Sequence, residues 1–217
     1  MKQLIFQFPF KTTYFENDFY VSSNNFEAYK LIESWPAWPS RCINIFGPSG
    51  CGKTHLANIL NKKISSIIIK SSNLKRDFLP NTINKKCIII DDFKNDIDEN
   101  LFYTIINQIY QSDQCIVINS LFPIKTSKIE LSDLKSRIAS FIDLRIELPT
   151  DDLLRVIITK SFSDMQISVD IKILEYIINN IDRSYENISK FIKELDLASL
   201  SSGKSININL IKKIINK

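Results

Sequence analysis

The sequence predicts an α/β fold, with helices packed on a parallel sheet, followed by a smaller all-helical region. Three observations support this prediction. A glycine-rich loop at 47–54 stands between an apolar run at 41–46 and an amphipathic run at 55–60. Short β-branched runs at 87–92 and 115–119 are typical of strands buried on both faces. After Pro149 only helical spacing remains, which places a domain boundary there.

The glycine-rich loop fits the phosphate-binding pattern G-x-x-x-x-G-K-[ST] at every fixed position. Its residues are Gly47, Pro48, Ser49, Gly50, Cys51, Gly52, Lys53 and Thr54. In such a loop the backbone N–H groups and the following helix dipole face an anion. Lys53 would reach the β- and γ-phosphates, and the Thr54 hydroxyl would ligate Mg²⁺. A strand before the loop and a helix after it favour nucleotide binding over a chance turn.

Composition limits the other classes of function. The 217 residues are 44% hydrophobic and carry a net charge of +4, which is weak evidence for nucleic acid. No apolar run approaches the roughly 18 residues of a membrane span, and no signal peptide is apparent, so we expect a cytoplasmic protein. Cys42, Cys51, Cys87 and Cys115 form no C-x-x-C pair. We expect reduced core thiols and no zinc site, with Cys51 open to modification.

The apolar spacing also predicts the individual elements. Strands are expected at 41–46, 65–69, 87–92, 115–119 and 142–148, with helices at 26–35, 55–60, 99–112 and 131–140. The segment 72–86 is read as helix or loop. Helices at 151–165, 169–180, 184–200 and 208–215 complete the chain, with Ser168 as the N-cap of the second.

Polar residues end the two buried strands. Asp91 and Asp92 end the run at 87–92, at the edge where open α/β sheets place their chemistry. We interpret Asp91 as the Mg²⁺ residue and Asp92 as the residue that orients water, in preference to a turn or a helix cap. Asn119 is equally compatible with a γ-phosphate sensor and with a strand-end turn. At the N-terminus, the alternation of Leu4, Phe6 and Phe8 fits an edge strand or a docking peptide.

Together these features resemble an AAA+ ATPase, and more closely the DnaA branch and its Hda-type regulators of bacterial replication initiation. Gly52 to Leu56 is similar to the exit of that branch's phosphate loop, and 19–25 to its adenine-binding box. The segment 35–39 is similar to the linker of alphaproteobacterial members. Leu134 to Arg137 matches the segment with the arginine finger. The resemblance covers nearly the whole chain.

The resemblance implies a parallel five-stranded αβα core at 13–149 and a small all-α lid at 150–217. It implies ADP or ATP with Mg²⁺ as cofactors. Asn119 would be sensor 1, and Arg137 an arginine finger acting in trans, although position alone favours an ordinary surface arginine. Glu186 replaces the usual sensor-2 arginine, which implies weak intrinsic turnover. The nucleotide contacts would extend beyond the loop to Tyr20, Val21, Asn25, His55 and Arg183.

The resemblance also implies partners. Gln3 to Phe8 is similar to the hexapeptide with which Hda proteins bind the sliding clamp, so 1–12 would be a clamp-binding tail anchored by Gln3, Leu4, Phe6 and Phe8. The expected function is to promote hydrolysis of DnaA-bound ATP and so prevent re-initiation. We expect no sequence-specific DNA binding, since no helix-turn-helix signature is present, and a homo-oligomer is compatible with the fold. The alternatives are an autonomous AAA+ ATPase acting on DNA and a small-molecule kinase.

Overall fold

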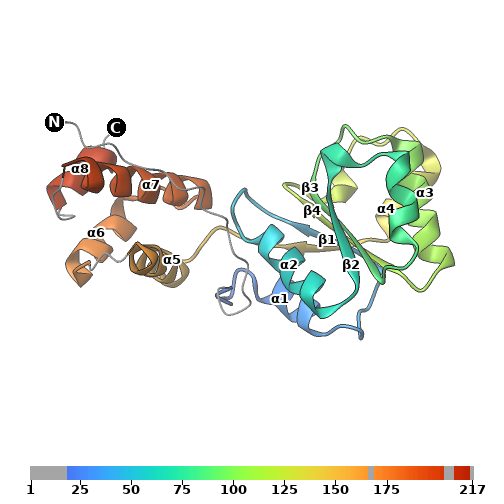
Figure 1. Ribbon diagram of the computed structural model, residues 1–217, viewed down its shortest axis with the longest axis horizontal. Coiled ribbons are helices and arrows are strands. Elements are labelled where there is room, and N and C mark those ends of the chain that lie inside the picture. The colour runs from blue at the N-terminus through green and yellow to red at the C-terminus, as the bar shows by residue number, and fades with distance from the viewer. Residues whose placement is uncertain (1–18, 166–168, 203–207, 216–217) are drawn as a thin grey trace. The chain divides into compact units, whose positions relative to one another are not determined.

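The computed structural model describes residues 19–165, 169–202 and 208–215 (Figure 1). The chain divides into two compact units between Glu147 and Leu148, and each is described by itself. The first unit contains the phosphate loop. The second contains only helices within its described residues.

The first unit is built on a five-stranded sheet in the order β2-β3-β4-β1-β5, in which every pair of neighbours is parallel. The strands are β1 (Cys42–Phe46), β2 (Ser66–Lys70), β3 (Cys87–Phe93), β4 (Cys115–Ser120) and β5 (Ile142–Arg145). Helices α1 (Phe26–Glu33) and α2 (Lys53–Lys63) lie on one side of the sheet, and α3 (Glu99–Gln111) and α4 (Ser132–Ala139) on the other (Figure 1). The predicted α/β fold with a parallel sheet is confirmed.

Burial on both faces explains the continuous apolar runs of β3 and β4. Alternate side chains of a strand point to opposite faces. Ile88 and Ile90 of β3, with Ile116 and Ile118 of β4, therefore join the core formed with α3 and α4. The residues between them, such as Ile89 and Val117, are equally buried from the other face.

Some boundaries differ from the prediction. The last strand ends at Arg145 rather than 148, because its neighbour β1 ends where the phosphate loop turns away. Ile146 N still donates to Phe46 O, but Glu147 N donates to Asn24 O instead. Two short 3-10 helices cover much of the ambiguous segment 72–86: η2 (Ser71–Asn73), which begins one residue before it, and η3 (Arg76–Thr82). A third, η4 (Ile124–Thr126), precedes α4.

The second unit contains α5 (Asp151–Asp164), α6 (Ile171–Asn180), α7 (Tyr185–Ser202) and α8 (Ile208–Ile215). Its core includes Leu154, Ile177, Phe191, Leu195 and Ile211. The predicted start of α6 was wrong: Ser168 lies outside the described residues, and Asp170 caps the helix by accepting from Lys172 N. In the part of the chain that is described, we find no helix with the length and apolar character of a membrane span.

Candidate functional site

The phosphate loop connects β1 to α2, and two of its glycines are required by close contacts. A Cβ on Gly47 would lie 2.4 Å from Ile146 O of the neighbouring chain segment. Gly52 has φ +99°, and its Cβ would lie 2.9 Å from the Phe19 ring. A larger residue at either position would displace backbone or an aromatic side chain, so the sequence pattern here has a local steric cause.

The ammonium group of Lys53 lies within this loop. Lys53 Nζ donates to Gly47 O and to Pro48 O, each at 2.8 Å. Phosphate oxygens would compete with these two carbonyl oxygens for the three protons of the Lys53 ammonium group. Cys51, a residue of the loop, is buried, and this burial raises the pKa of its thiol above the usual value although the charge of Lys53 lowers it. Its burial and raised pKa both disfavour the expected modification of Cys51.

The structure brings together three residues predicted to act at the phosphates. Thr54 Oγ1 donates to Asp91 Oδ2 at 2.8 Å, and Asn119 Nδ2 donates to Asp91 Oδ1 at 2.8 Å. Asp91 and Asn119 are buried. Among the described residues, Asn119 Oδ1 is a buried acceptor without a hydrogen-bond partner. Carboxylate and hydroxyl oxygens beside a phosphate loop are suitable ligands for Mg²⁺, so these residues fit the expected nucleotide and metal.

Asp92 is separated from this cluster by a β-bulge. Ile90 pairs with Ile118 and Phe93 with Ser120, so Asp91 and Asp92 together oppose Asn119. Asp92 has φ +54°, a left-handed conformation that aspartate tolerates better than most residues, and its side chain is exposed. Bulges of this kind re-aim side chains beside active sites. Here the bulge leaves one carboxylate buried and the next one in solvent.

The adenine box predicted at 19–25 forms a closed loop. Asn25 Nδ2 donates to Tyr20 O at 2.9 Å, and Asn25 Oδ1 accepts from Ser22 N at 2.9 Å. Tyr20 is 47% exposed and Val21 is half-buried. Phe19 packs edge-on against His55, with ring centroids 5.3 Å apart, and stacks on Tyr29. The loop is thereby held beside the start of α2.

Arg137 lies at the end of the sheet where β1 begins, opposite to the end that the phosphate loop follows. It is in the last turn of α4, with its Cζ 4.5 Å from the ring centroid of Tyr110. Both side chains affect the pKa of the Cys42 thiol, at the first residue of β1. Burial raises this pKa to about 11, while the hydrogen bond from Tyr110 and the charge of Arg137 lower it. The phosphate loop follows the last residue of β1. The structure therefore does not bring Arg137 to the chain's own phosphate site.

The remaining predicted site residues lie elsewhere. Arg183 is in the helical unit, where it pairs with Asp151 at 3.0 Å. Glu186 is exposed in the first turn of α7. Gln3, Leu4, Phe6 and Phe8 lie outside the described residues.

Two residues in or near the site were not predicted. Phe19 belongs to the predicted box at 19–25 but was not predicted as a site residue, and its ring lies against Gly52. Asn44 is fully buried in β1, where its amide donates to Ile118 O and Ser120 Oγ and accepts from Ile124 N. These hydrogen bonds hold the chain before and after Asn119, at the end of β4. A lone amide inside an apolar strand was the available signal.

A pocket of about 430 Å³ lies away from the phosphate loop, between the start of β3 and the end of α3. Its lining includes Ile83, Gln108 and Gln114. The Gln108 and Gln114 amide groups donate to Thr82 and to nearby backbone or side-chain oxygens. The pocket holds none of the predicted site residues.

The phosphate loop, the buried Asp91 and the β2-β3-β4-β1-β5 order together define an AAA+ phosphate-loop core. The structure of domain III of Thermotoga maritima DnaA matches 96% of this chain and 98% of that chain, with a TM-score of 0.77 and 18% identity. AMPPCP-bound DnaA from Aquifex aeolicus matches 85% of this chain and 65% of its own, with a TM-score of 0.68 and 19% identity. The RuvB branch migration motor of T. maritima matches 81% of this chain and 61% of its own, with a TM-score of 0.62. These likenesses establish the fold.

Comparison of sequences gives the particular relatives. The chromosomal replication initiator protein DnaA of Buchnera aphidicola is 29% identical over 80% of this chain and 45% of that protein. The DnaA of Porphyromonas gingivalis is 25% identical over 92% of this chain and 48% of that protein. The chain thus spans about half the length of the curated relatives it matches. A family model described as RNA helicase matches residues 43–129. The chain carries a DnaA-like AAA+ domain.

Proposed function

We propose that this protein is a nucleotide-bound regulator of DNA replication initiation. It docks on the sliding clamp through residues 3–8 and promotes hydrolysis of ATP bound to DnaA. Its own site holds ADP or ATP with Mg²⁺, between Lys53, Thr54 and Asp91 on the phosphate side and the loop at 19–25 on the base side. The AMPPCP-bound state of the DnaA structure that it resembles supports the nucleotide assignment.

The observation that carries this proposal is the location of Arg137. The four residue steps from Cys42 to Phe46 span roughly 13 Å, with Arg137 at one end and the phosphate loop at the other. A guanidinium on that edge is accessible to another protein's nucleotide and distant from its own. Arginine fingers supplied in trans stabilise the transition state of phosphoryl transfer in this manner.

The test measures hydrolysis of radiolabelled ATP pre-bound to DnaA, with DNA-loaded clamp. Wild type should accelerate it, and Arg137→Ala should lose most of the acceleration, which for fingers in trans reaches roughly 10³–10⁵. Arg137→Lys should restore little, because an ammonium lacks the planar fork. Arg76→Ala, at an exposed arginine of η3, is the matched control. Full activity of Arg137→Ala would exclude the finger, and inactivity of the wild type would exclude the function.

The second candidate is an autonomous AAA+ ATPase that remodels DNA complexes. It is favoured by the Thr54, Asp91 and Asn119 cluster and by the likeness to RuvB. Against it stands Glu186, which supplies no cation for the transition-state charge. Single-turnover assays decide between the two. DNA-stimulated hydrolysis by the purified chain above about 1 s⁻¹ would favour this candidate, and negligible loss of ATP over minutes would favour the regulator.

A further inference from the structure

We infer that Tyr110 is the positioning residue for Arg137. This inference rests on the proposed function, because it concerns the arginine that the proposal assigns to a partner's nucleotide. The guanidinium carbon lies 4.5 Å from the centroid of the Tyr110 ring, within the range of a cation–π contact. Tyr110 is 41% exposed and Arg137 is half-buried, so the pair lies at the surface while the ring covers one side of the guanidinium.

A second contact joins the same two residues through Ser140. Ser140 Oγ donates to Arg137 O at 2.6 Å, and it lies 2.7 Å from the Tyr110 hydroxyl. Ser140 Oγ therefore bridges the Tyr110 hydroxyl and the Arg137 carbonyl. Tyr110 thus contacts Arg137 at both ends, through its ring at the guanidinium and through Ser140 at the backbone.

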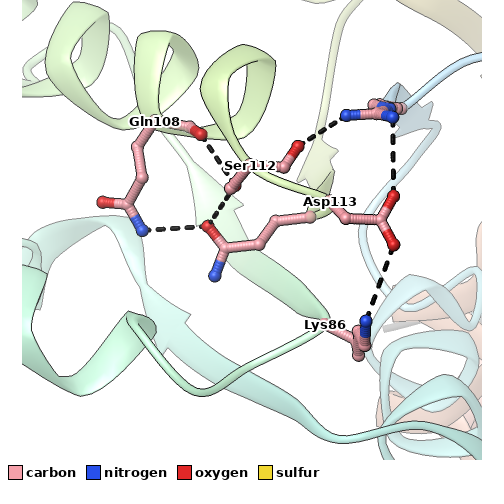
Figure 2. Close-up of polar contacts among 6 residues, drawn as sticks. Lys86, Gln108, Ser112 and Asp113 are labelled. Atoms are coloured by element: carbon pink, nitrogen blue, oxygen red, sulfur yellow. Dashed lines mark hydrogen bonds and ion pairs between the residues drawn. The ribbon is translucent and has the colours of Figure 1, made fainter.

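The turn that follows Tyr110 at the end of α3 makes polar contacts through Ser112 and Asp113 (Figure 2). Arg41, just before β1, donates from Nη1 to Ser112 O, and Ser112 Oγ donates to Gln108 O at 2.7 Å. Asp113 lies 3.4 Å from the Arg41 guanidinium and 3.6 Å from Lys86 Nζ, just before β3. The turn that follows Tyr110 is therefore attached to the starts of two sheet strands.

Helices α3 and α4 are joined at their other ends as well. The Glu99 carboxylate, in the first turn of α3, accepts from Glu130 N and Leu131 N ahead of α4. Between the two ends, Leu134 and Ile138 of α4 pack into the core that α3 shares. The ring of Tyr110 is thus a fixed surface, and it restricts the several rotatable bonds of Arg137 before any partner binds. A small misplacement of a catalytic group can cost roughly 10²-fold in rate. Restricting Arg137 in advance should therefore matter for its action as an arginine finger.

The first experiment observes Arg137 directly and needs no partner. The Nε–Hε resonance of Arg137, identified by its loss in Arg137→Lys, is compared by NMR with that of exposed Arg76. The wild-type signal should be shifted by the aromatic ring and have the higher order parameter. Tyr110→Phe should keep the ring shift, and Tyr110→Leu should remove it. A wild-type signal as mobile and unshifted as that of Arg76 would overturn the inference.

The second experiment measures stimulation of hydrolysis of DnaA-bound ATP. Tyr110→Leu should lower the maximal rate roughly 10–100-fold with an unchanged half-saturating concentration. Tyr110→Phe, which keeps the cation–π contact, should remain within about 3-fold of wild type. In an Arg137→Ala background, Tyr110→Leu should have no further effect. A further loss there, or faster hydrolysis with Tyr110→Leu, would overturn the inference. No stimulation by the wild type would instead refute the proposed function, while the NMR result still decides the positioning.

Discussion

At the scale of single residues, Asp91 connects two other polar residues of the candidate site. Its two carboxylate oxygens accept separately from Thr54 and Asn119, so one buried side chain joins the Thr54 hydroxyl to the end of β4. The motif predicts Thr54, and the strand ends predict Asp91 and Asn119. Their mutual bonds could not be predicted, because they depend on the register between β3 and β4 and on the bulge at Asp92.

Lys53→Ala should weaken nucleotide binding about 10–100-fold, because it removes charge-assisted hydrogen bonds to phosphate. The measurement is titration calorimetry with ADP and ATP. Saturating nucleotide should also raise the melting temperature of wild type more than that of the variant, because ligand binding stabilises the native state. Lys75→Ala, at an exposed lysine before η3, is the control. Equal affinities in Lys53→Ala and wild type would contradict the phosphate-loop assignment.

Cys42 should make stability depend on alkaline pH. Burial raises its pKa from 9.0 to about 11 in the folded protein. The unfolded chain therefore releases this proton first, and the stabilising contribution is complete below pH 9 and is lost as the pH rises to about 11. The loss is roughly 2–3 kcal/mol. Denaturant unfolding between pH 8 and 11 should give a shallower decline for Cys42→Ala, and identical slopes would contradict this assignment.

At the scale of elements, the apolar strands and amphipathic helices were predictable, because burial on one or both faces leaves a direct pattern in the sequence. The segment 72–86 was not, since short 3-10 turns have no such period. The end of β5 depends on where its neighbour β1 stops, which no local pattern records. The Tyr110–Arg137 contact requires the packing of α3 on α4, so Tyr110 could be read from sequence only as a surface residue.

Glu99→Gln should weaken the attachment of α4 to α3. The carboxylate accepts two backbone N–H groups ahead of α4, and a neutral amide accepts less strongly. We expect a loss of about 1 kcal/mol in the free energy of unfolding, as for loss of a helix cap. Chemical denaturation measures it, with Asp96→Asn in the exposed loop before α3 as control. Unchanged stability would mean that apolar packing alone joins the two helices.

At the scale of the whole molecule, the proposal separates partner docking from folding. Replacing Gln3, Leu4 and Phe6 together with alanine should abolish binding to the sliding clamp, since short docking peptides depend on a few anchor side chains. Melting temperature and nucleotide affinity should be unchanged. Surface plasmon resonance on immobilised clamp measures the first, and calorimetry the second. Retained clamp binding, or a loss of thermal stability, would indicate that these residues form part of the fold.

The opposite locations of Arg137 and the phosphate loop also restrict the symmetry of any complex that uses both. A twofold axis brings the same patch of two copies together, so such a contact would join like edge to like edge. Reaching a nucleotide with Arg137 requires a head-to-tail contact between unlike edges. In any pair built this way, one arginine is engaged and one nucleotide site stays outside the contact. Such a complex is directional, and its growth ends only when a ring closes or a partner lacks the matching edge.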